Sequence, residues 1–390
     1  MSLDPSQATI GDDADEEFDA TEVTSQSEVK RRRSTSKFEM EVPGEPIRVQ
    51  SLAQNDKAQV VPPQYIQRPE NRPNKPCPNT VAADSDSSKC IPVIDLLGGD
   101  ICEDLVQACR EWGSFQVTNH GVPIRLLDDM RSVGRSFFED CPMPQKLSYS
   151  CDPNSPASEG YGSRMLVASN DTVLDWRDYF DHHTLPLSRR NPSRWSHFPP
   201  NYREVVEEYS DRMKVLAQKL LGLISVSLGL PSSCIEESIG EFYQNITVSY
   251  YPPCPQPELT LGLQSHSDMG AITLLIQDEV GGLQVFKDGE WVNVNPVCDA
   301  IVVILADQTE IITNGEYRSA QHRALTNVNS ARLSVATFHD PAKTVKISPA
   351  IELVSESSPL RYCQVLYGDY VSSWYIKGPE GKRNIDALLF

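Results

Sequence analysis

The sequence lacks the features that would place it in a membrane, a secretory route or a nucleic-acid complex. It has no run of eighteen apolar residues, so we expect no membrane span. It opens with Met-Ser-Leu-Asp-Pro and no apolar segment follows, so we expect no secretory signal. Its 35 Lys and Arg stand against 54 Asp and Glu, which gives a formal net charge of -19. Because binding to phosphates needs a basic surface, we expect no nucleic-acid partner.

The sequence also lacks closely spaced cysteines. Its ten cysteines are scattered and contain no Cys-x-x-Cys pair, which disfavours both a disulfide framework and a cysteine-ligated zinc site. We therefore expect reduced thiols in a cytoplasmic, monomeric protein. The basic run Lys30-Arg31-Arg32-Arg33 keeps nuclear import open as an alternative.

The composition divides the chain into five parts. Residues 1–45 are polar, acidic and poor in aromatics. Because they have too little apolar surface to bury to offset the conformational entropy lost on ordering, we predict a disordered tail. Residues 46–90 are rich in proline, and we expect an extended arm on the domain surface. Residues 91–243 form a helix-rich region, 244–350 a strand-rich core, and 351–390 a closing helix and tail.

Two kinds of periodicity indicate the fold. Apolar residues at helical spacing predict helices over 101–112, 126–139, 203–228 and 367–376. Short apolar runs between Gly, Asp, Asn and Pro turns predict strands over 91–96, 113–119, 245–251, 271–277, 283–286, 290–294, 300–305 and 332–338. Short strands at even spacing are typical of a jelly roll. We predict an α+β fold with a double-stranded β-helix (jelly-roll) core flanked by helices.

The most informative motif is His266-Ser267-Asp268, with His322 further along the chain. On a strand, residues two apart point to the same face, so His266 and Asp268 would lie together. Two imidazoles and one carboxylate with open positions are the ligands of non-haem Fe(II) oxygenases. A lone His-x-Asp is also common in surface turns, so the interpretation depends on His322 and on the motif after it.

Arg332-Leu333-Ser334 is that motif, and its first and third residues again share a strand face. A guanidinium forks onto a carboxylate, and a hydroxyl can donate to the same oxygen. We therefore predict an anchor for an acidic cosubstrate beside the metal. By the same alternation, Phe338 points inward with Arg332, and His339 points to the outer face.

Counting back by twos from Tyr251 gives a wall of neutral side chains at Ser249, Thr247 and Asn245. This wall predicts hydrogen bonds to hydroxyls and no cation for an acidic substrate. Among the other histidines, a substrate-facing role stays open for one of His182 and His183, whereas we expect His120 to be structural and His197 to lie in a loop. We expect Cys254, in a proline-rich turn, to be buried and inert.

These motifs resemble the plant 2-oxoglutarate- and Fe(II)-dependent dioxygenases, which include flavonol synthase, anthocyanidin synthase and the jasmonate-type oxygenases. The resemblance runs from about Ile91 to Phe390, and weakly back to Arg48. It is carried by IPVIDL, ACREWGSFQVTNHGV, EGYGS, DWRDYF, YREVVEEYS, YYPPCPQPEL, HSD, GGLQV, ITNGEYRSAQHR and RLSVATFHDP. The chain departs from the usual Asn, Phe and Gly of these enzymes at Ser249, Ser114 and Ala306.

The resemblance implies an oxidoreductase that uses Fe(II), O2 and 2-oxoglutarate, with ascorbate as a supporting reductant. It assigns the metal ligands to His266, Asp268 and His322, and the far carboxylate of 2-oxoglutarate to Arg332, Ser334 and Tyr251. It also places two aromatic side chains against the organic substrate, Phe338 and Tyr179. The implied reaction is hydroxylation, desaturation or dealkylation of a small plant specialised metabolite or hormone, with release of succinate and CO2.

Three alternatives stay open from the sequence. The chain could be a relative that does not use 2-oxoglutarate, as in the ethylene-forming amino-acid oxidases. It could be a non-catalytic small-molecule-binding jelly roll, although its three metal-ligating residues are intact. It could be a zinc hydrolase with the same ligands, although the Arg-x-Ser motif and the lack of an obvious Glu general base argue against that.

Overall fold

The computed structural model describes residues 48–54, 60–73, 90–99, 101–152, 159–163, 173–377 and 383–390. The predicted tail and the basic run Lys30-Arg31-Arg32-Arg33 lie outside the described residues. Within those ranges, no helix has the length and apolar character needed to cross a membrane.

The helices are α1 Val49–Ala53, α2 Ile101–Glu111, α3 Ile124–Glu139, α4 Met143–Leu147, α5 Tyr202–Ser227, α6 Cys234–Ile239, α7 Asp307–Ile312, α8 Tyr367–Lys377 and α9 Arg383–Asp386. The strands are β1 Val93–Asp95, β2 Ser114–Thr118, β3 Gly160–Gly162, β4 Asp178–Leu185, β5 Tyr243–Tyr251, β6 Leu263–His266, β7 Ile272–Gln277, β8 Leu283–Lys287, β9 Glu290–Asn293, β10 Ile301–Leu305, β11 His322–Ala324, β12 Arg332–Asp340, β13 Lys346–Ile347 and β14 Val365–Leu366.

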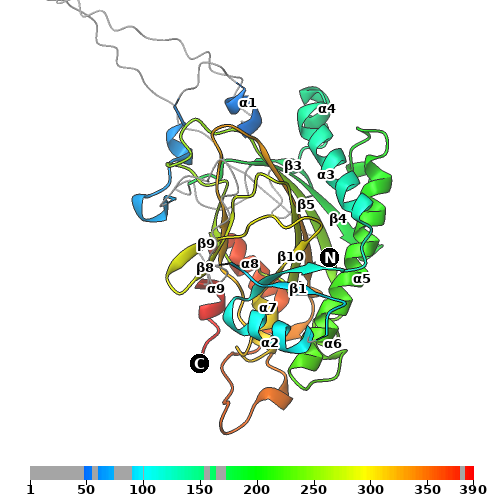
Figure 1. Ribbon diagram of the computed structural model, residues 1–390, viewed down its shortest axis with the longest axis vertical. Helices are drawn as coiled ribbons and strands as arrows, with labels where there is room; N and C mark the ends of the chain where they lie inside the picture. Colours follow the sequence, from blue (N-terminus) through cyan, green and yellow to red (C-terminus); the bar gives the residue numbers. More distant parts are fainter. Residues whose placement is uncertain are drawn as a thin grey trace, which may run out of the picture. The chain divides into compact units, whose positions relative to one another are not determined.

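Two sheets form the core. The larger has the order β1-β2-β10-β7-β12-β5-β4-β3, and the smaller has the order β6-β11-β8-β9. Helices α3 and α5 pack together along one face of the larger sheet (Figure 1). The predicted jelly roll flanked by helices is confirmed.

Apolar side chains fill both faces of the larger sheet. On the helix side, Phe137 of α3 stacks on Phe180 of β4 with ring centroids 4.4 Å apart. On the other side, residues of β7 and β10 pack against β8 of the smaller sheet, for example Leu275, Ile304 and Val285. This is why β7 and β10 are buried at every position, and why β10 is a continuous apolar run instead of an alternating one.

Each predicted helix and strand overlaps an observed one. The elements without a predicted range are β3, β4, β6, β11, β13, β14 and the short helices α1, α4, α6, α7 and α9. β4 pairs with β5 along its length, so the sheet draws strands from both sides of residue 243. The expectation of an extended arm is corrected for the described part of residues 46–90. That part holds α1 and two 3-10 turns, and Val49, Val61 and Tyr65 are buried against Trp176 in a small apolar cluster.

Candidate active site

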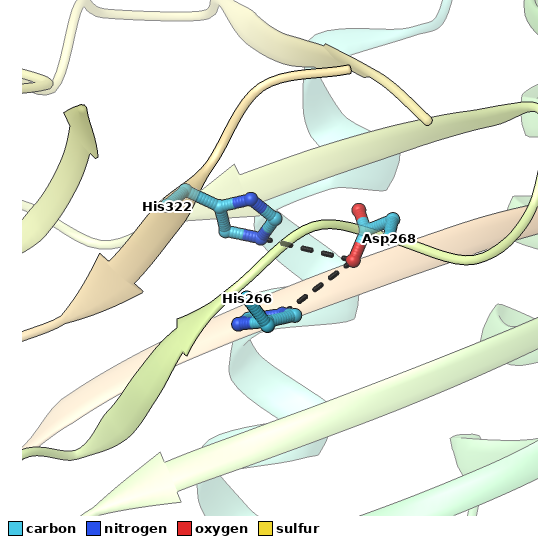
Figure 2. A group of neighbouring side chains, drawn as sticks. All are labelled: His266, Asp268 and His322. Carbon is cyan, nitrogen blue, oxygen red and sulfur yellow. Dashed lines mark ion pairs between the residues drawn. The ribbon is translucent and has the colours of Figure 1, made fainter. Parts of the chain in front are cut away.

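Three side chains from two paired strands and an adjoining loop converge inside the jelly roll. The pairing of β6 with β11 places His322 opposite His266. The Nε2 atoms of His266 and His322 lie 3.5 and 3.7 Å from Oδ1 of Asp268. Figure 2 shows all three side chains pointing toward one another. Their ligand atoms lie within 4.8 Å of one another, so this group could hold one metal ion.

The geometry corrects the reason we gave for the His-x-Asp spacing. Strand β6 ends at His266, so Asp268 lies in the loop that leads to β7 and does not share a strand face with His266. The carboxylate reaches the histidines because the loop turns back. The hydroxyl of Thr273, on β7, donates to Asp268 Oδ2 at 2.6 Å and leaves Oδ1 directed at the imidazoles.

Backbone carbonyls fix the tautomers of both histidines. Nδ1 of His266 lies 2.8 Å from the carbonyl of Gln264, and Nδ1 of His322 lies 3.0 Å from that of Ala320. A carbonyl only accepts, so each Nδ1 carries the proton and each Nε2 keeps a lone pair for a metal.

The protonation states also suit a metal. Burial and the neighbouring His266 lower the pKa of His322 to about 4, so the ring is neutral at neutral pH. Burial raises the pKa of Asp268, but His322, His266 and the hydrogen bond from Thr273 outweigh that effect and lower the pKa to about 2. Neutral imidazole nitrogen and carboxylate oxygen are ligands that suit Fe(II), and the donor set therefore fits that ion.

A buried cation stands near this centre. Arg332 is 2 % exposed, and its guanidinium donates to Ser334 at 3.1 Å and to Gln277 at 3.3 Å. Its Nε is buried and has no hydrogen-bond partner among the described residues. Such an unsatisfied donor is costly unless a ligand accepts from it, and a carboxylate is the natural acceptor. The site therefore fits the far carboxylate of 2-oxoglutarate.

Tyr251 lies beside this candidate anchor. The register of β5 against β12 places Tyr251 opposite Arg332 and Ser249 opposite Ser334. The Arg332 guanidinium lies 4.8 Å from the centre of the Tyr251 ring. Burial raises the pKa of Tyr251, but the charges of Arg332 and Arg177 and hydrogen bonds with Ser334 and Ser249 lower it overall.

Two adjoining cavities lie at this site: an inner one at the candidate anchor and metal centre, and a wider outer one. The inner one, of about 40 Å³, is lined by all three candidate ligands and by Arg332, Ser334 and Tyr251. The outer one, of about 190 Å³, is lined by Tyr179, by Phe338 and by α8 through Val371 and Trp374. Phe338 lines both cavities, so the predicted inward face of β12 is confirmed.

The outer pocket is charged, contrary to our expectation. The neutral Thr247 and Asn245 of β5 do line it, but the segments just before and after β4 bring cations. Arg177 Nη1 lies 3.3 Å from Ser249 Oγ, and Arg189 lies over the ring of Tyr243 at 4.4 Å. The prediction for the β5 wall considered that strand alone, so it did not include the cations that flank β4 in the same pocket. Buried and partly buried residues alternate over most of Asp178–Leu185, as expected of a strand.

The pocket also contains two carboxyls. Thr247 donates to Asp181 at 2.6 Å, and Asn245 donates to Asp340 at 3.3 Å. Burial raises the pKa of Asp181 to about 6. Burial, together with the charge of Asp268, raises the pKa of Asp340 to about 7. The net charge of this pocket therefore changes near neutral pH.

The structure separates the two histidines for which a substrate-facing role was open, and it agrees with the predictions for His120 and His339. His183 lines the outer pocket, whereas His182 is buried on the opposite face of β4, 3.0 Å from the Tyr202 hydroxyl. His339 is buried on the helix side of β12, against Phe242. The ring nitrogens of His120 make hydrogen bonds with backbone groups, which is a structural role.

Comparison with known proteins identifies the family. Residues 242–341 match the model of the 2OG-Fe(II) oxygenase superfamily. Residues 91–202 match the model described as non-haem dioxygenase in morphine synthesis N-terminal. Jasmonate-induced oxygenase 4 of Arabidopsis thaliana is 40 % identical over 88 % of this chain and 97 % of its own length. Flavonol synthase/flavanone 3-hydroxylase of Petunia hybrida is 36 % identical over 83 % of this chain and 93 % of its own.

A solved structure agrees with both matches. The crystal structure of JOX2 in complex with 2OG, Fe and JA superposes with a TM-score of 0.81 and 37 % identity. That alignment covers 90 % of this chain and all of JOX2. The chain therefore belongs to the plant branch of the 2OG-Fe(II) oxygenase superfamily, and it is a 2-oxoglutarate- and Fe(II)-dependent dioxygenase that uses iron, 2-oxoglutarate and O2.

Proposed function

We propose that this enzyme oxidises a small plant specialised metabolite or hormone with an apolar body, by hydroxylation, desaturation or dealkylation. The observation that carries the proposal is the continuous inward face of β12. It runs from Arg332 and Ser334, past the three candidate ligands, to Phe338 at the outer pocket. In this proposal, the cosubstrate and the organic substrate bind along one strand face, on either side of the metal.

In this proposal His266, Asp268 and His322 hold Fe(II). The bound iron supplies the redox chemistry that activates O2 while 2-oxoglutarate is decarboxylated to succinate and CO2. Arg332, Ser334 and Tyr251 bind the far carboxylate of 2-oxoglutarate and fix its orientation.

The outer pocket then orients the organic substrate. Phe338 and Tyr179 supply aromatic faces, and Val371 and Trp374 of α8 line the same pocket. These apolar side chains help to exclude water from the reacting carbon. Ring stacking contributes roughly 0.5–1.5 kcal/mol beyond the area buried.

A carboxylate-bearing substrate of the jasmonate type is a second candidate. JOX2 is solved with JA, and Arg177 supplies a buried cation at the junction of the two cavities in this chain. The Arg177 side chain is 8 % exposed, and its nearest acidic atom is Asp175 Oδ2 at 3.9 Å from Nε. That distance is close to the limit of an ion pair, so the guanidinium remains able to bind a second carboxylate.

Succinate formation from a panel of neutral phenolics and of acidic hormones, with iron-loaded enzyme, tests both candidates. Phe338→Ala and Tyr179→Ala should weaken turnover of the true substrate while uncoupled decarboxylation of 2-oxoglutarate persists. Arg177→Gln should weaken only an acidic substrate. Normal turnover in both aromatic variants would contradict the proposed pocket, and no release of CO2 from 2-oxoglutarate with any substrate would contradict the cosubstrate.

The cytoplasmic location and the monomeric state belong to the same proposal. They are supported by free thiols at the nine cysteines in the described ranges and by the acidic composition. Size-exclusion chromatography with light scattering tests the monomer.

A further inference from the structure

Helix α7 lies between the two segments that carry the candidate metal ligands. It follows β10 and contains two carboxylates one turn apart, Asp307 and Glu310, which therefore lie on the same side of the helix. Their residues are 1 % and 8 % exposed. Two buried carboxylates on one short helix are costly unless each is hydrogen-bonded, so their partners show what the helix does.

Asp307 holds the loop that carries Asp268. Its backbone N–H donates to the carbonyl of Asp268 at 2.9 Å, and the hydroxyl of Ser267 donates to its Oδ2 at 3.2 Å. The next residues of α7 continue this clamp, because the Gln308 side chain donates to Met269 and the Thr309 hydroxyl donates to Ala271. This is the physical cause of the turn that brings Asp268 back to the histidines.

Glu310 holds the segment that leads to His322. Its Oε2 accepts from the backbone N–H of Ser319 at 2.6 Å. The next residue, Ala320, supplies the carbonyl that fixes the ring of His322. One helix therefore positions an atom of each ligand-bearing segment.

Both carboxylates also accept from tyrosines of the C-terminal segment. Tyr370, on α8, donates to Asp307 Oδ2 at 2.6 Å, and Tyr362 donates to Glu310 Oε1 at 2.7 Å. Burial and the adjacent carboxylates raise the pKa of each tyrosine, so each hydroxyl keeps its proton. Val371 beside Tyr370 lines the outer pocket, so the same contacts connect the pocket wall to the candidate metal centre.

We propose that Asp307 and Glu310 are positioning residues that brace both ligand-bearing segments against Tyr370 and Tyr362. Metal affinity then depends on two tyrosine hydroxyls in a segment that supplies no metal ligand. The inference rests on the proposed ligands His266, Asp268 and His322.

The test is anaerobic calorimetric titration of Fe(II) into the full chain, which needs no organic substrate. Tyr370→Phe and Tyr362→Phe each delete one hydroxyl and keep the ring. Tyr250→Phe is the matched control: it also deletes a buried tyrosine hydroxyl bonded to a carboxylate, Glu139 at 3.2 Å, but on the helix side of the sheet. Thermal unfolding of the same variants reports their stability.

Tyr370→Phe and Tyr362→Phe, the brace variants, should each weaken Fe(II) binding on the order of fivefold to tenfold. Each loses one charge-assisted hydrogen bond, and we expect part of its free energy to appear as lost metal affinity. Tyr250→Phe should bind Fe(II) like the wild type even if its Tm falls. Wild-type Fe(II) affinity in both brace variants, or an equal loss in Tyr250→Phe, would overturn the brace. Fe(II) binding that survives His266→Ala would contradict the proposed ligands instead, so the two failures are distinguishable.

Discussion

Replacing Arg332 with Ala should raise the concentration of 2-oxoglutarate that the enzyme needs. The guanidinium is 2 % exposed and has a buried Nε without a partner among the described residues, so a bound carboxylate would complete its hydrogen bonding. Its contacts with Ser334 and Gln277 hold the fork in place before the ligand arrives. The ligand therefore binds a preorganised cation and does not have to order one.

The size of the effect follows from the loss of a buried charge pair. Truncating one partner of such a pair costs roughly 2–5 kcal/mol, which is about 30-fold or more in affinity. Arg332→Lys keeps the charge but loses the fork, so it should fall between the alanine variant and the wild type. Ser334→Ala removes a single hydroxyl and should cost less than Arg332→Ala.

The assay is release of CO2 from carboxyl-labelled 2-oxoglutarate over a range of concentrations. Arg190→Ala is the control, because the Arg190 side chain is also buried, pairs with Asp211 at 2.9 Å, and does not line either cavity. An unchanged 2-oxoglutarate requirement in Arg332→Ala, with weaker use of the organic substrate, would show that Arg332 faces the wrong ligand. Turnover that needs no 2-oxoglutarate in the wild type would favour a related oxidase of another kind.

Three further predictions concern the metal, the pocket and the tail. Turnover should be abolished in each of the variants His266→Ala, Asp268→Ala and His322→Ala, while the circular dichroism spectrum stays native. The reason is that three ligands are needed to hold the ion with open positions. Activity above about a tenth of wild type, with iron as the only metal, would contradict the assignment. Asp340 has a folded pKa of about 7 against 3.8 for its ordinary value, so its stabilising contribution is complete below about pH 4 and is lost as pH rises through 7. Asp340→Asn should therefore raise the free energy of unfolding of the metal-free protein at pH 8 by on the order of 1–2 kcal/mol, measured by urea unfolding. At pH 4 we expect no gain. An equal effect at both pH values would exclude the titration of Asp340 as the cause. Deleting residues 1–45, which are poor in apolar residues, should leave turnover and Tm nearly unchanged, and a fall of more than about 4 °C would mean that the tail contributes ~1 kcal/mol of docking.

The sequence by itself indicated the ligand types and determined the inward face of β12. Alternation with a period of two is a local property, so Arg332, Ser334 and Phe338 could be assigned to one face before any fold was known. The chemistry of imidazole, carboxylate and guanidinium then indicated iron and an acidic cosubstrate. Helical spacing likewise predicted α2, α3, α5 and α8 close to their observed bounds.

Only the tertiary structure decided which distant segments meet. The pairing of β6 with β11 brings His322 to His266, and α7 turns the loop that carries Asp268. The pairing of β4 with β5 brings Arg177 into a pocket whose charge we had expected to be neutral. Local periodicity contains no information about such partners, because strand order and helix docking depend on the burial of apolar surface over the whole domain. The chemistry of the site can therefore be predicted from the sequence, whereas the charge and shape of its substrate pocket depend on the fold.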